Sequence, residues 1–263
     1  MKRRALCLAV TGLGLWLAGT SGSWAATVIL DGTIFKQADG TTYDTWNINM
    51  STAGSFRVDV LAYEASQSST ATAGYFASDL NGDGELTWLD PDTYFYRNTG
   101  NPLTAADALV RADDINNNTP VYQNGLTAAT SPVTVTSLSQ AEGATDGSIH
   151  FRRDPAFTVD MAAGQYRFLV ADFRLTTTEA ESGINTGDSF SPPTGFVGPI
   201  TDHADYRVAL SGNDVAFLLS GNTITISPVP LPAAAWLFVS GVAGLMGIAQ
   251  THSRRSRKNH GSV

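Results

Sequence analysis

The sequence predicts an all-β protein, an antiparallel jelly-roll-like β-sandwich lying between two terminal apolar segments. Stretches of alternating apolar and polar residues recur along the chain, and they are rich in Thr, Val, Tyr and Phe. Gly, Asn, Asp, Ser and Pro separate these stretches, as expected of turns. Between the two ends, no long stretch sustains the three-and-four apolar spacing of an amphipathic helix. A body of about 200 residues can enclose a single substantial core, so we expect one domain. The alternative is two small, closely packed halves.

The predicted strands follow one another along the body. Residues 215–219 and 223–226 form an expected hairpin across Ser220, Gly221 and Asn222. A helical turn is expected only within 104–111, and loops are expected at 65–74 and 183–199. The alternating apolar positions that we expect to face the core are Phe56, Val58 and Val60, then Phe157 and Val159, then Tyr166, Phe168 and Val170, and finally Tyr206, Val208 and Leu210.

The N-terminus has the form of a secretory signal peptide, residues 1–25. Lys2, Arg3 and Arg4 precede an apolar stretch at 5–18, and small residues then allow cleavage after Ala25. The alternative is an uncleaved anchor, which the shortness of the apolar stretch disfavours. Cys7 is the single cysteine and lies in this segment, so the mature chain has no disulfide.

The C-terminus, residues 228–258, has the pattern of a membrane-sorting segment. A proline-rich motif at 228–232 precedes an expected transmembrane helix at 231–249, followed by a basic tail at 252–260. About 19 helical residues span roughly 29 Å, enough for a hydrocarbon core. Arg254 and Arg255 stay cytoplasmic, which places the body outside the inner membrane. The alternative, a buried core helix, does not account for this basic cluster.

This tail resembles a PEP-CTERM sorting signal. The residues that carry the resemblance are Pro228, Val229, Pro230, Leu231 and Pro232, followed by an Ala-Ala-Ala-Trp-Leu-Phe run and the basic cluster. The family occurs on exoproteins of Gram-negative bacteria that make exopolysaccharide. The resemblance implies processing by an exosortase-like enzyme and delivery to the cell surface or extracellular matrix.

The body between the two signals is strongly acidic. All 24 acidic residues lie there, whereas only nine of the 16 basic residues do, which leaves a net charge of −15. Such a charge disfavours nucleic acid and anionic membranes as partners and favours divalent cations.

Part of the body resembles the bacterial pre-peptidase C-terminal type of module. The resemblance rests on Tyr-Asp-Thr-Trp at 43–46, the strand at 54–63, Asp-Pro-Asp-Thr-Tyr-Phe-Tyr at 90–96, Asn-Thr-Gly at 98–100, Asp-Asp at 113–114 and Ala-Gly-Gln-Tyr at 163–166. It implies a jelly-roll-like sandwich that binds or targets without an active site of its own.

Residues 79–90 form the one internal motif with evident chemistry. Oxygen-bearing side chains alternate and Gly84 then supplies a sharp turn, a pattern typical of a Ca²⁺ loop, with Leu86 attaching the loop to the core. Residue 85 coordinates through its carbonyl oxygen. The predicted ligands are Asp79, Asn81, Asp83, Glu85, Thr87 and Asp90.

The closing residue of this loop is Asp, as in dockerin-like modules, which it resembles. Its short side chain predicts a Kd on the order of 10⁻⁴ to 10⁻³ M and a structural role for calcium. Asp92, Asp113 and Asp114 are candidates to complete the shell. The alternative is an Asx-rich turn without metal.

We expect no catalytic residues. His203 lies between Asp202 and Asp205, which could raise its pKa or help it to hold a metal, but no nucleophile elbow, zinc helix or phosphate loop accompanies it. The leading hypothesis is therefore a non-catalytic, calcium-stabilised surface or matrix protein associated with exopolysaccharide. The alternatives are a lectin-like module and a polysaccharide hydrolase that uses acidic pairs. In the lectin-like module, sugars would stack on Trp46, Trp88, Tyr94 or Tyr96, although the place of these aromatics in alternating strands favours a core position for most of them.

Overall fold

The computed structural model describes the body of the chain, and several predicted features lie outside it. It covers residues 26–66, 76–77, 79, 82, 84–113, 119–140, 154–186, 190, 192 and 196–229. The signal peptide, the membrane helix at 231–249 and the basic tail all fall outside these ranges, as do the predicted ligands Asn81 and Asp83. No helix within the covered ranges has both the length and the apolar character to cross a bilayer.

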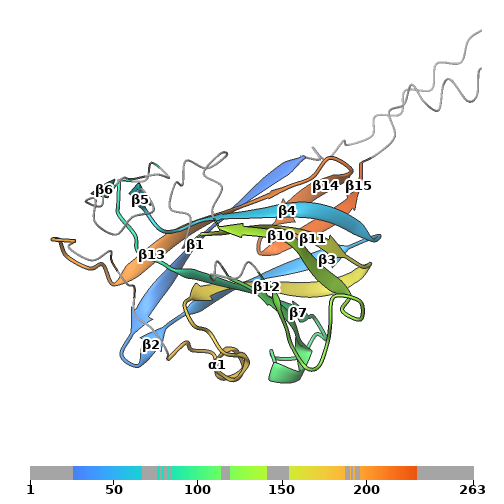
Figure 1. Ribbon diagram of the computed structural model, residues 1–263, viewed down its shortest axis with the longest axis horizontal. Coiled ribbons are helices and arrows are strands. Elements are labelled where there is room, and N and C mark those ends of the chain that lie inside the picture. The colour runs from blue at the N-terminus through green and yellow to red at the C-terminus, as the bar shows by residue number, and fades with distance from the viewer. Residues whose placement is uncertain are drawn as a thin grey trace, which may run out of the picture.

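Two β-sheets form a sandwich, which confirms the all-β prediction (Figure 1). A third, two-stranded sheet joins β5 (Ala65–Ser66) to β6 (Phe76–Ala77). In spatial order, the first sheet contains β10 (Val133–Gln140), β11 (Pro155–Met161), β4 (Gly54–Leu61), β13 (His203–Ser211), β1 (Thr27–Gln37) and β2 (Gly40–Thr41). The second contains β14 (Val215–Ser220), β15 (Thr223–Pro228), β3 (Tyr43–Met50), β12 (Gly164–Asp172), β7 (Pro91–Arg97), β8 (Ala108–Ala112) and β9 (Val121–Tyr122).

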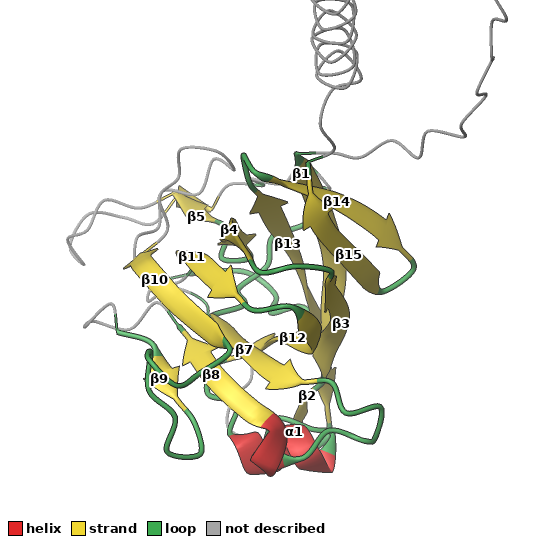
Figure 2. Ribbon diagram, turned by 90° about the vertical axis from the view of Figure 1, so that its right-hand side faces the viewer, coloured by secondary structure: helices red, strands yellow, loops and turns green. Residues whose placement is uncertain are grey.

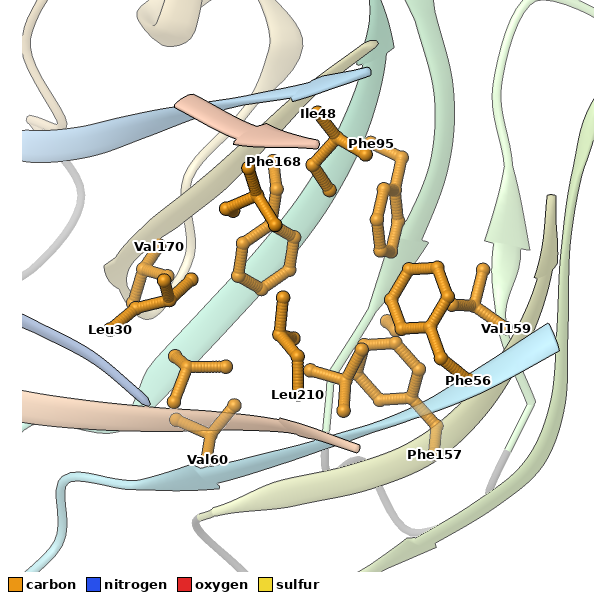
Figure 3. Packing of buried hydrophobic residues seen from close by; sticks show 14 of the residues in the cluster. Leu30, Ile48, Phe56, Val60, Phe95, Phe157, Val159, Phe168, Val170 and Leu210 are labelled. Carbon is orange, nitrogen blue, oxygen red and sulfur yellow. The ribbon is translucent and has the colours of Figure 1, made fainter. Parts of the chain in front are cut away.

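The core lies between the two sheets, and the alternating positions predicted to face it are all buried. Figure 3 shows several of these side chains, among them Phe56, Phe157 and Phe168, meeting in the space between the sheets. Phe95 of β7 packs against Phe168 of its own sheet, with ring centroids 5.1 Å apart, and against Phe157 of the opposite sheet at 6.2 Å. Each large apolar side chain buried in this way contributes about 1.5–3 kcal/mol to folding.

One strand pairing departs from the predicted antiparallel pattern. The hairpin of β14 and β15 forms as expected, with a turn at Gly221, but β15 then pairs with β3 in the parallel sense. A parallel pair requires a long crossover connection. Here the connection is nearly the whole body, and no local sequence pattern reports such a pairing.

A short helix that the sequence pattern did not predict packs against part of the outer face of the second sheet. This helix is α1 (Thr177–Ser182), which lies at one end of the sheet (Figure 2). Tyr94 and Tyr96 of β7 and Leu169 of β12 form a buried cluster with Ala180 of α1. The helix begins with a capping box between Thr176 and Glu179, a Thr-x-x-Glu signal that is visible in the sequence.

The helical turn expected within 104–111 forms only at its start. Residues Ala105–Asp107 make a single 3-10 turn, η1, and β8 then begins at Ala108 and pairs with β7. Pairing of the buried residue Val110 with Phe95 of β7 overrides the local helical tendency.

The first and last described residues lie at the same end of the sandwich. The amide of Gly212 donates to the carbonyl oxygen of Ala26, and the amide of Val229 donates to that of Asp214. β13 begins at His203 and ends at Ser211, next to Gly212. His203 therefore lies at the opposite end of this strand from the described termini (Figure 1). Eight residue steps at about 3.3 Å each separate the two ends of β13 by roughly 26 Å.

Candidate metal-binding end of the sandwich

The start of the predicted calcium loop is a tight turn around the carboxylate of Asp79. The amide of Gly82 donates to Oδ1 at 2.6 Å, and that of Gly84 donates to Oδ2 at 2.8 Å. Both glycines have left-handed φ angles of 80° and 93°, and an added Cβ would meet no neighbour. Backbone conformation rather than lack of space therefore favours glycine at both positions.

The second half of the loop is attached to the core. Leu86 packs against Tyr63 and Trp88, as predicted for the residue that fixes the loop. The hydroxyl of Thr87 is fully buried and lies 3.1 Å from the carbonyl oxygen of Ala62 and 3.2 Å from that of Asp205. Thr87 therefore ties the loop to the strand β13, and its role as a calcium ligand stays a prediction.

Asp90, the predicted closing ligand, is buried beside a second carboxylate. Its amide donates to Oδ1 of Asp172 at 3.3 Å. The amides of Phe173 and Phe190 also donate to the Asp172 carboxylate, at 3.1 and 2.9 Å. A buried carboxylate is stable only when hydrogen bonds replace its lost hydration, so Asp172 organises the backbone around Asp90.

Two further carboxylates bind backbone amides in the same part of the fold. Oδ1 of Asp154 accepts hydrogen bonds from the amides of Ala62 and Tyr63 at 3.1 and 3.0 Å. Oε2 of Glu64 accepts one from the amide of Thr87 at 2.9 Å. Sequence patterns place acids at the ends of strands, but they do not show which amides those acids will meet.

Asp92 and Asp113, candidates for the calcium shell, instead contact Arg111. The Nε of Arg111 lies 2.7 and 2.8 Å from the two oxygens of Asp92, and Nη2 lies 2.6 Å from Oδ2 of Asp113. Complete burial raises the pKa of Asp92, and the adjacent guanidinium opposes that rise. Asp114 lies outside the described residues.

His203 lies between two carboxylates at this end of the molecule. Its Nε2 is 2.7 Å from Oε2 of Glu85 and its Nδ1 is 2.9 Å from Oδ1 of Asp202. These two hydrogen bonds, first that of Asp202 and then that of Glu85, raise the pKa of His203 to about 9. Asp205 lies nearby, and its Oδ1 accepts a hydrogen bond from the hydroxyl of Thr33 at 2.5 Å.

Potential metal ligands of Glu85, His203 and Asp205 lie within 4.8 Å of one another. This is the only such group of three acidic or histidine side chains among the residues that the structure covers. Asp79 and Asp90 therefore do not join the Glu85 carboxylate in a cluster of this kind. The sequence indicated Asp202 and Asp205 as neighbours of His203, but it held no signal for Glu85.

The aromatic residues considered for sugar stacking are mostly part of the core. Trp88, Tyr94 and Tyr96 are each at most 3% exposed. Trp46 is half-buried, and its indole N–H donates to the hydroxyl of Tyr206 at 2.8 Å. Four residues chosen from sequence alone thus provide no exposed stacking platform.

The described residues form an all-β sandwich. At the end remote from both of its described termini, this sandwich carries several carboxylates and the imidazole of His203. Comparisons with known proteins give no match to a family model, to a curated protein or to a solved structure.

Proposed function

We propose that this chain is an exported, non-catalytic protein of the cell surface or extracellular matrix. A PEP-CTERM/exosortase-like system delivers it, and its jelly-roll-like β-sandwich is stabilised by Ca²⁺ at residues 79–90. Its partners are the exosortase-like processing enzyme and exopolysaccharide, and the inner membrane holds the precursor through the helix at 231–249. The resemblance to pre-peptidase C-terminal type modules is part of the same proposal.

The observation that supports sorting most directly is where the proposed processing sites fall relative to the strands. Cleavage after Ala25 leaves one residue before β1 begins at Thr27. The sorting motif starts at Pro228, the last residue of β15. Removal of both terminal segments therefore takes away no strand of the sandwich, and the core that forms before processing is retained after it.

The shared location of Ala26 and Val229 also fits a tethered precursor. A chain held in the membrane by its C-terminal helix would project the sandwich outward from that end (Figure 1). The end that carries Glu85 and His203 would then face away from the membrane. Exopolysaccharide is the partner that this destination makes available.

Calcium fits the loop because the turn around Asp79 concentrates negative charge in an already acidic body. Carboxylate, amide and carbonyl oxygens are the ligands that Ca²⁺ prefers. A bound cation would reduce the repulsion among these acids and brace the connection that leads to Thr87 and Asp90. Its stabilisation would be largest outside the cell, where calcium reaches millimolar levels.

The test of sorting is intact-mass analysis of the product in a Gram-negative host that has an exosortase, with an exosortase-deletion strain as the matched control. The proposal expects a released species that begins at residue 26 and ends within 228–232, and retention of the membrane-bound precursor in the deletion strain. Recovery of the full chain, both termini intact, from the soluble cytosol would overturn the proposal.

Retention of the released species on the host's own exopolysaccharide, but not on dextran beads, tests the partner.

A further inference from the structure

Glu85, His203 and Asp205 meet at the start of β13 although they come from two distant parts of the chain. His203 and Asp205 are two residues apart on the strand, so their side chains leave the same face, while Ala204 and Tyr206 between and beyond them are buried in the core. Glu85 reaches this face from the loop at 79–90, and its Oε2 lies 2.7 Å from Nε2 of His203.

The backbone that carries these three side chains is held in place by buried contacts. Thr87, two residues after Glu85, lies with its hydroxyl within hydrogen-bonding distance of the Asp205 carbonyl oxygen. On the other side, Thr33 of β1 donates to the Asp205 carboxylate, and Asp205 is its partner in the β1–β13 register. The positions of Glu85 and Asp205 are therefore fixed relative to each other by the fold and not only by their own side-chain contacts.

The imidazole of His203 is oriented by a neighbouring carboxylate. Oδ1 of Asp202 lies 2.9 Å from Nδ1, which directs Nε2 toward Glu85. A carboxylate bound to one ring nitrogen while the other faces the ligand position is the common arrangement around histidines that bind metals. The next side chain on this face, Arg207, is paired with Asp31 at 2.8 Å.

We propose that Glu85, His203 and Asp205 form a binding site for a divalent transition metal, with Zn²⁺ as the ion that fits best. One imidazole nitrogen and two carboxylate oxygens would supply three ligands, and water would complete a tetrahedral shell. The nitrogen ligand favours Zn²⁺ over Ca²⁺ and Mg²⁺, which prefer oxygen alone. The proposed function does not include this site.

The geometry requires only small movements to bind the ion. Bonds of 2.0–2.2 Å place tetrahedral ligand atoms about 3.4 Å apart, and here the ligand atoms already lie within 4.8 Å of one another. The side chain of Glu85 is 46% exposed, so it has room to move. The predicted calcium loop uses the carbonyl oxygen of residue 85, so the two sites are compatible in one molecule.

The experiment is a zinc titration of the full chain, purified in detergent, stripped with EDTA and held near pH 8, where Zn²⁺ must displace the proton of His203 to bind. Isothermal calorimetry compares wild type with H203Q and E85Q. D214N, at the opposite end of the sandwich, is the matched control because it also alters one exposed acid. Because the chain has four histidines, total zinc uptake does not report on His203 alone. The quantity compared is therefore the zinc-binding site that is present in wild type and lost in H203Q.

The expected result is one equivalent of Zn²⁺ that wild type and D214N bind, and that H203Q and E85Q bind at least tenfold more weakly while retaining the wild-type circular dichroism spectrum. X-ray absorption at the zinc edge should show a mixed nitrogen and oxygen shell in wild type. Equal zinc binding by wild type and H203Q would overturn the proposal. Displacement of the zinc by roughly millimolar Ca²⁺ would also overturn the zinc proposal, because the zinc would then be occupying the calcium loop. Calcium binding without zinc binding would overturn the zinc proposal and leave the proposed function intact.

Discussion

Nε2 of His203 lies 2.7 Å from Oε2 of Glu85, although 118 positions separate the two residues in the chain. The contact joins the loop at 79–90 to the first residue of β13 at the end of the sandwich remote from both described termini. The sequence associated His203 only with its neighbours Asp202 and Asp205. In the structure, His203 contacts carboxylates from two separate segments of the chain. The stability of the loop should therefore respond to the protonation of His203.

The first prediction concerns the titration of His203 without metal. Its pKa is raised to about 9 in the folded protein, above the unfolded value near 6.5. A raised pKa means that the contribution of the charged pair is fully present below about pH 6.5 and is lost as the pH rises through about 9. Histidine ring resonances followed by NMR in EDTA should show this pKa directly.

The variant E85Q should lower the pKa of His203, since it removes one of the two carboxylates that hold the proton, and D214N should leave the pKa unchanged. The melting temperature of wild type should fall between about pH 7 and pH 10 by more than that of E85Q. The pair is partly exposed, so the difference will be small. Identical pKa values for His203 in wild type and E85Q would show that the contact is absent in solution.

The second prediction concerns calcium. With a Kd on the order of 10⁻⁴ to 10⁻³ M, about 10 mM Ca²⁺ should stabilise the fold by about 1.4–2.7 kcal/mol. The melting temperature should then rise by several degrees. D83A should lose this rise because it removes a predicted ligand, while D214N should keep it. Equal melting of D83A and wild type with and without calcium would contradict the predicted site.

The third prediction compares two arginines of the body. R111A should destabilise the protein by about 3–5 kcal/mol, because it leaves the fully buried Asp92 without its ion partner. R207A removes an exposed pair with Asp31, so its cost should be about 0–1 kcal/mol. Urea unfolding measures both, and comparable losses in the two variants would show that Arg111 and Asp92 do not form a buried pair.

The fourth prediction concerns the start of α1. The hydroxyl of Thr176 accepts a hydrogen bond from the amide of Glu179, whose carboxylate accepts one from the amide of Thr176. T176A should cost about 1 kcal/mol and speed hydrogen exchange at Ala180 and Gly183, whose amides close the helix. T178A changes an exposed position of the same helix and serves as control. Equal exchange rates in the two variants would contradict the capping role.

The sequence by itself determined the all-β class, the inward faces of the main strands and the C-terminal hairpin. These features depend on residues that are close together in the chain, so alternation and turn chemistry report them directly. The same local logic located the glycine-rich turn after Asp79 and the contact of Leu86 with the core. The sequence also contains the Thr-x-x-Glu capping pattern at Thr176 and Glu179. Only the structure identified this pattern as the start of α1.

Tertiary structure alone decided which distant segments meet. The parallel pairing of β15 with β3 and the approach of Glu85 to His203 each join residues separated by long stretches of chain. The contact of Arg111 with Asp92 depends on the pairing of β8 with β7. Such contacts follow from how two twisted sheets stack and which loops their edges bring together. A linear pattern of residue types carries no record of that geometry, because the same alternation is compatible with many strand orders.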